Sequence, residues 1–125
     1  MLTDIIFMNI VKSMETDTPL IADAHRIDPE RLRQAAGQAV ALLKTLGNED
    51  RLLLLCQLSQ GEHSVGDLEA ALDIRQPTLS QQLGVLRNEG LVATRRDGKR
   101  IFYSLADANA MQVLSLLYQL FCPKE

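Results

Sequence analysis

A short stretch of the 125-residue chain carries neutral hydrogen-bonding side chains at nearly every position. They are Gln76, Thr78, Ser80, Gln81 and Gln82. Glutamine can pair through both amide atoms with an adenine edge in the major groove of DNA, and Ser or Thr can bind phosphates or bases. Glu and Lys would make a helix surface equally soluble. This choice of small neutral groups therefore favours contact with double-stranded DNA.

Basic side chains follow in the same region of the chain. Residues 75–105 hold six cations and two anions, which gives +4 and leaves −7 for the rest of a chain of net charge −3. A basic segment on an acidic body is typical of nucleic-acid-binding proteins, although a charged, solvated hairpin is the alternative. The cations expected near DNA phosphates are Arg87, Arg95, Arg96, Lys99 and Arg100. Because neighbouring residues of a strand face opposite ways, Arg95 and Arg96 should not face DNA equally, and the same holds for Lys99 and Arg100.

Two cysteines, Cys56 and Cys122, could do covalent chemistry. A free cysteine is among the most buried residue types and usually serves as a small apolar side chain. His25 and His63 could in principle complete a four-ligand zinc site with them, but the spacing follows no known zinc pattern. We therefore predict no metal and no cofactor. We also find no nucleophile–base signature, which predicts that the chain is not an enzyme.

Helices and one hairpin are expected to position these residues. Apolar residues at helical spacing predict helices over residues 28–46, 48–60, 67–72, 76–89 and 107–122. Residues 91–96 and 99–105 read as strands around Asp97-Gly98, which we place at the two central positions of a type I′ turn. The fold class is thus mainly α with a small β-hairpin. Residues 28–122 are predicted as one domain, and residues 1–27 as an N-terminal extension.

Local signals mark where the helices begin. Asn48 is expected to cap a helix, Asp107 to begin the last helix, and Ser64 with Asp67 has the form of a capping box. The second helix, with four consecutive leucines, is predicted to be buried on nearly all sides, Cys56 included. Two short helices joined tightly at residues 73–75, the second with a polar outer face, indicate a helix-turn-helix.

The run from Leu46 to Leu105 resembles the ArsR/SmtB family of winged helix-turn-helix repressors. The turn, the polar helix and the hairpin, or wing, occur in the family's order and spacing, and the flanking helices fit its first and last helices. The resemblance implies a homodimer assembled through those flanking helices. It also implies an operator with inverted-repeat symmetry.

The metal sites of that family are expected to be absent here. Many relatives bind metal through two cysteines in the third helix, where this chain has Ser64 and Gly66. Others use carboxylates and histidines on the last helix, where residues 107–122 contain Asp107 but neither His nor Glu. The resemblance to metal sensors therefore does not extend to their ligands.

The placement of Cys56 and Cys122 is similar to that in a thiol-based branch of the family. In that branch the two cysteines become linked by oxidants or persulfides, and the repressor then leaves its operator. The resemblance implies such a redox switch here, with an oxidant or a reactive sulfur species as the signal. The alternatives are a metal-responsive repressor and a winged-helix protein-interaction module without DNA binding.

The location of the protein is predicted from what its apolar segments can do. No apolar run reaches the length of a membrane span, and the apolar start of the chain has neither a basic leading region nor a small-residue cleavage site. We therefore expect a cytoplasmic protein with no membrane partner. In that compartment the two cysteines should be thiols at rest.

Overall fold

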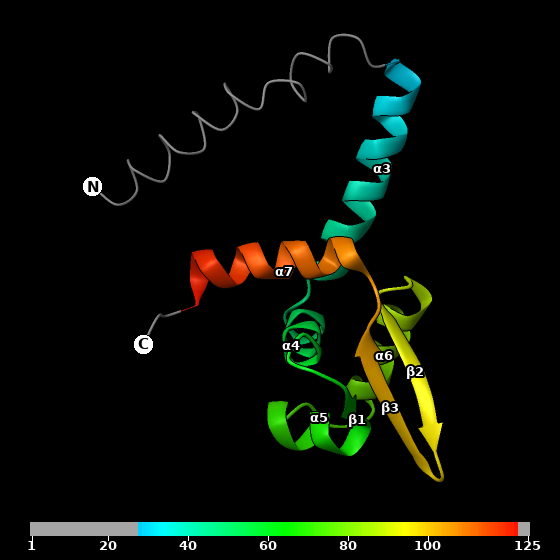
Figure 1. The fold of residues 1–125 in the computed structure, drawn as a ribbon, viewed down its shortest axis with the longest axis vertical. Coiled ribbons are helices and arrows are strands. Elements are labelled where there is room, and N and C mark those ends of the chain that lie inside the picture. The colour runs from blue at the N-terminus through cyan, green and yellow to red at the C-terminus, as the bar shows by residue number, and fades with distance from the viewer. Residues whose placement is uncertain (1–27, 123–125) are drawn as a thin grey trace, which may run out of the picture. The chain divides into compact units, whose positions relative to one another are not determined.

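The computed structural model describes residues 28–122 and confirms a mainly helical winged helix-turn-helix with a small antiparallel sheet (Figure 1). The elements are α3 (Pro29–Leu46), α4 (Glu49–Leu58), β1 (His63–Ser64), α5 (Val65–Leu72), α6 (Thr78–Asn88), β2 (Val92–Asp97), β3 (Arg100–Leu105) and α7 (Ala108–Phe121). The chain divides within α3 into a first unit that ends at Val40 and a second that begins at Ala41. The start of the domain at residue 28 stays a prediction. None of the helices described could cross a membrane.

Asn48 and Ser64 cap helices as predicted, and Asp107 caps the helix that it was expected to begin. The side chain of Asn48 accepts a hydrogen bond from the N–H of Arg51 at 3.0 Å, and that of Asp107 accepts one from the N–H of Ala110 at 2.8 Å. Ser64 and Asp67 form a complete capping box, with bonds of 3.1 and 3.2 Å. Such caps satisfy N–H groups that have no partner within the helix.

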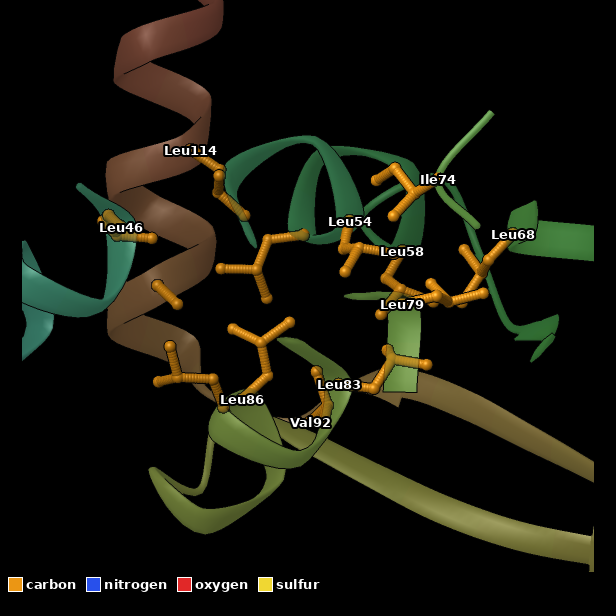
Figure 2. Packing of buried hydrophobic residues seen from close by; sticks show 13 residues of the cluster. Leu46, Leu54, Leu58, Leu68, Ile74, Leu79, Leu83, Leu86, Val92 and Leu114 are labelled. Atoms are coloured by element: carbon orange, nitrogen blue, oxygen red, sulfur yellow. The ribbon is translucent and has the colours of Figure 1, made fainter. Parts of the chain in front are cut away.

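The core is a cluster of aliphatic side chains to which each of the helices within residues 28–122 and β2 contribute (Figure 2). Its fully buried large members are Leu54, Leu55, Leu68, Leu79, Leu83 and Leu86. Figure 2 shows Leu46 and Leu114 at one end of the cluster and Leu68 at the other. The predicted inward stripe of α6 is thus confirmed, and α6 packs directly on α4.

Helix α4 is buried on one face only, which corrects the prediction that it is buried all round. Leu54, Leu55 and Leu58 are buried, whereas Leu53 is 39% exposed and Cys56 is also exposed. A helix turns about 100° per residue, so positions 53 and 56 share a face. That face lies opposite the core. The uniform run of leucines hid this difference, because apolar character does not distinguish a buried leucine from a half-exposed one.

The connection between α5 and α6 contains a residue with left-handed backbone. Asp73 has φ of 54°, and its N–H donates to the carbonyl of Glu69 at 3.0 Å. Ile74, one residue on, is buried in the core. Helix α6 then begins at Thr78, two residues later than Gln76, where the sequence places its start.

The wing belongs to a three-stranded antiparallel sheet of order β1-β3-β2. Strand β1 was not predicted, and it places His63, expected in a loop, opposite Tyr103. Figure 1 shows β2 and β3 as a long hairpin whose turn lies far from α7.

The wing turn differs from the predicted type I′ turn at Asp97-Gly98. Asp97 pairs with Arg100, so the central residues are Gly98 and Lys99. Only Gly98, at φ of 64°, has a positive φ. A glycine with positive φ at the first central position is typical of a type II′ turn, which also suits the twist of a hairpin.

Candidate nucleic-acid interface and cysteine groove

The first turns of α6 present polar side chains of differing freedom. Gln81 is exposed and makes no side-chain hydrogen bond to any residue the structure describes. Gln76 and Ser80 are also exposed but bind each other: the Ser80 hydroxyl donates to Gln76 Oε1 at 2.6 Å, and the Ser80 N–H donates to it at 3.1 Å. Thr78 is half-buried. Gln76 therefore acts as a local cap for α6, and its amide N–H groups remain free to donate.

Gln82, the fifth residue predicted to face DNA, is half-buried and bound to α4. Its Oε1 accepts a hydrogen bond of 2.9 Å from the guanidinium of Arg51. The same guanidinium donates to the carbonyls of Thr45 and Lys44 at 2.7 and 3.1 Å. Arg51 thus joins the end of α3, the start of α4 and the middle of α6, and Gln82 is one of its three acceptors.

On one face of the wing, Arg95 is held by a carboxylate. Its guanidinium donates to both oxygens of Glu62 at 2.6–3.0 Å and lies 4.4 Å from the centre of the Phe102 ring. These hydrogen bonds hold the pKa of Glu62 below its ordinary range and raise that of Arg95. Arg95 crosses β3 to reach Glu62, so the contact ties β2 to the segment before β1.

Arg100 lies over the same aromatic ring, at 4.9 Å from its centre. It donates to the hydroxyl of Ser64 at 3.1 Å and lies 3.8 Å from the carboxylate of Asp67. The pKa of Asp67 is lowered, first by its hydrogen bonds from Ser64 and then by the charge of Arg100. This second contact attaches the start of β3, next to the wing turn, to the capped start of α5.

Three of the predicted cations have no acidic partner among residues 28–122. They are Arg87, in the last turn of α6, Arg96, on β2, and Lys99, in the wing turn. All three are exposed. Arg96 pairs with Ile101 across the hairpin, and this register puts it on the face opposite Arg95, as strand alternation predicts.

The two cysteines line one groove between α4 and α7. The groove has a volume of about 570 Å³ and is walled mainly by apolar side chains, among them Leu53, Met111 and Tyr118. Both thiols are free and exposed, so Cys56 does not have the buried, inert position expected for it. The pKa of Cys56 is raised, mainly by partial burial and secondarily by the nearby thiolate charge of Cys122.

A polar contact borders this groove. Gln57, which also lines it, lies with its amide nitrogen 3.2 Å from the imidazole Nε2 of His63. The other ring nitrogen of His63 is 2.7 Å from the carbonyl of Gly61. No group of three or more His, Cys, Asp or Glu within residues 28–122 is arranged to hold a metal ion. His25 lies outside the described residues.

Sequence reasoning missed two residues that organise this surface, Arg51 and Glu62. Both act through partners that are distant in the chain, Gln82 and Arg95 respectively. An arginine in a helical first turn or a glutamate in a loop gives no local signal of such a contact. Phe102 gave a weak one, since an aromatic residue on a strand flanked by cations can support a guanidinium.

Comparison with known proteins identifies the family. Residues 48–94 match the model of the bacterial regulatory protein arsR family. The chain is 53% identical over 114 residues to the biofilm growth-associated repressor of Agrobacterium fabrum, and the match covers 90% of this chain and 97% of that protein.

Solved structures agree. The transcriptional repressor BigR from Xylella fastidiosa matches with a TM-score of 0.71 and 50% identity, over 78% of this chain and all of that one. A homodimeric winged helix-turn-helix DNA-binding domain from Mycobacterium bovis matches with a TM-score of 0.65 and 30% identity, over 74% of this chain and 86% of that one. These relatives are regulators rather than enzymes. The chain therefore belongs to the ArsR family of winged helix-turn-helix transcriptional regulators, and among them it is similar to the biofilm growth-associated repressors.

Proposed function

We propose that this chain represses transcription as a cytoplasmic homodimer that binds an inverted-repeat operator and leaves it when Cys56 and Cys122 become linked. The observation that carries the proposal is the shared groove: both thiols are free, exposed and on its wall. The influence of Cys122 on the pKa of Cys56 supports their proximity. Exposure matters because a thiol must be reached by its oxidant.

Dimer formation is supported by exposed apolar side chains on two helices. Helix α7 exposes Leu116 (52%), Leu120 (51%) and Phe121 (77%), and α3 exposes Leu32 (50%) and Leu43 (61%). Large apolar side chains that are exposed along a helix are candidates for contact with another protein. The homodimeric relative makes a second copy of this chain the expected cover. Two copies related by a twofold axis would present two α6 helices to an inverted repeat.

DNA contact is assigned to the start of α6 and to the wing. Gln76, Thr78, Ser80 and Gln81 would contact bases and nearby phosphates, and the helix N-terminus adds favourable N–H groups and dipole. Arg87, Arg96 and Lys99, which have no acidic partner in the described part of the chain, would bind phosphates.

Linking the two thiols would act on α6 through α4. Cys56 and Arg51 lie on the same helix, and Arg51 binds Gln82 of α6. A shift of α4 toward α7 would therefore move α6, the helix proposed to contact bases. It would also move α7 and with it the proposed dimer contact. A hundredfold loss of operator affinity needs only about 2.7 kcal/mol of coupling free energy.

The chemistry can proceed with an organic persulfide as the oxidant. One cysteine thiolate takes the outer sulfur of the persulfide and releases the organic thiol. The second thiolate then attacks the new cysteine persulfide, forms the disulfide and releases hydrogen sulfide. Two cysteine thiols are oxidised, and the persulfide is reduced to a thiol and hydrogen sulfide. A trisulfide bridge needs a second equivalent of the organic persulfide, which converts the other cysteine to a persulfide as well. Attack of one cysteine persulfide on the other then retains one added sulfur and releases the second as hydrogen sulfide.

The test is a binding titration on a duplex from the region upstream of the chain's own gene. The protein is titrated reduced and again after treatment with inorganic polysulfide, with intact mass measured in both states. Binding when reduced, release after treatment, and a mass change abolished in Cys56→Ser and Cys122→Ser would support the proposal. Release that persists in both single variants would refute the thiol switch. Release by zinc or copper ions would support a metal-responsive repressor, and failure to bind any duplex at low salt a protein-interaction module.

A further inference from the structure

The wing carries four cations, but the structure divides them into two kinds. Arg95 and Arg100 are bound to acidic or hydroxyl partners on the segment from Glu62 to Asp67. Arg96 and Lys99 are exposed and have no such partner among the described residues. A count of wing charges therefore overstates the number of cations that can neutralise DNA.

The Arg95 contact has the geometry of a fixed brace. A bidentate pair with Glu62 uses Nε and one terminal nitrogen of the guanidinium, and the ring of Phe102 supports its face. Such fork-to-fork pairs hold orientation as well as charge. Arg95 comes from β2 and Glu62 from the segment before β1, so the brace spans the three-stranded sheet. It restricts how far the hairpin can swing against α5.

A DNA phosphate would gain little by taking Arg95 from Glu62. The phosphate would be neutralised, but Glu62 would be left as an uncompensated anion beside the DNA. The salt dependence of binding reports the number of phosphates neutralised, because each one releases condensed counterions. An arginine whose charge a carboxylate already neutralises therefore does not add to the salt dependence of DNA binding.

We infer that Arg95 is a positioning residue that fixes the wing through Glu62 and Phe102, and that Arg96 and Lys99 supply the wing's phosphate contacts. This inference rests on the proposed DNA binding. Arg95 and Arg96 thus have different roles, whereas strand alternation by itself predicts only that they face opposite ways.

Lysine substitution separates the two roles. A phosphate contact needs a positive charge, which lysine keeps, whereas the brace needs the planar fork of arginine, which lysine lacks. Arg95→Lys, Arg95→Gln, Arg96→Lys and Arg96→Gln form a matched set at neighbouring positions. Glu62→Gln removes the partner of Arg95, and Glu89→Gln is its control, since Glu89 is an exposed acid at the end of α6 with no ion pair in residues 28–122.

The measurement is the affinity of reduced protein for the upstream duplex and for an unrelated duplex at several salt concentrations. Urea unfolding of each variant first establishes that it is folded. The slope of log K against log salt is negative, and Arg96→Gln should make it shallower by about 0.9 per chain. Arg96→Lys should restore the original steepness. Arg95→Gln should leave the slope unchanged. Both Arg95 variants should reduce the discrimination between the two duplexes, and Arg95→Lys should not rescue it.

Three outcomes would overturn the inference. The first is a salt dependence that becomes shallower in Arg95→Gln and is restored in Arg95→Lys, since that is the signature of a phosphate contact. The second is unchanged discrimination in both Arg95 variants. The third is discrimination that falls equally in Glu62→Gln and Glu89→Gln, since an effect of acid removal alone would then explain it. Failure of the unmodified protein to bind either duplex would instead refute the proposed function.

Discussion

The contact between Arg51 and Gln82 should contribute measurably to the free energy of unfolding. Gln82→Met keeps the length of the side chain and removes the acceptor of a 2.9 Å hydrogen bond from a guanidinium. Net contributions of hydrogen bonds to charged groups are about 1.5–3 kcal/mol, and half-buried partners belong at the lower end. We therefore expect Gln82→Met to cost about 1.5 kcal/mol.

Arg51→Met should cost about twice as much, because two further acceptors each lose a donor. These are the carbonyls of Lys44 and Thr45 in the last turn of α3, of which that of Lys44 keeps a hydrogen bond of 3.3 Å from the N–H of Gly47. The expected loss is about 3 kcal/mol. In the double variant the Gln82 substitution should cost almost nothing more, so the coupling free energy should be about 1.5 kcal/mol.

The assay is urea unfolding of the four reduced proteins without DNA, at one fixed protein concentration. The concentration must be held constant because association of subunits shifts apparent stability. A coupling free energy near zero would refute the idea that Gln82 supports α6 through Arg51. A neutral Gln82→Met combined with a large loss of DNA affinity would show instead that Gln82 reads bases.

Three further outcomes are expected. Ser64→Ala, which breaks the capping box of α5, should cost about 1 kcal/mol in urea unfolding, and a cost near zero would show that the box is dispensable. Leu83→Ala, in the fully packed core, should cost about 3–5 kcal/mol, and a loss below about 1 kcal/mol would mean that the core refills the space. The alkylation rate of Cys56 should rise with pH through a midpoint above that of an ordinary thiol, because its pKa is raised. Cys122→Ser should move that midpoint down, and no movement would contradict the charge effect of Cys122.

Local rules account for the parts of the fold that the sequence predicts well. Asn48, Ser64 and Asp107 cap helices where expected, because a cap depends on residues only three positions away. The inward stripe of α6 follows from helical spacing alone. The order of helices, turn and wing was predictable for the same reason, since each element is recognised by its own residues.

Contacts between distant residues account for what the sequence did not predict. Strand β1 has only two residues, too few for an alternating pattern, and it exists because it pairs with β3. Gln82 looks like its neighbours until Arg51, 31 residues earlier, takes its amide oxygen. Arg95 looks like Arg96 until Glu62, 33 residues away, binds it. The exposure of Cys56 likewise depends on which face of α4 meets the core.

The left-handed backbone at Asp73 has a consequence for the evolution of this protein. Its side chain is 91% exposed, and its carboxylate lies 3.8 Å from the guanidinium of Arg75, which is also exposed. Most residue types are normally exchangeable in such a position. A φ of 54° removes that freedom, because only Gly, Asn and Asp adopt it readily. A valine or isoleucine there would have to rotate the chain and change the angle between α5 and α6. Neutral substitution at this exposed position is therefore limited to three residue types, which is as restrictive as at a buried site.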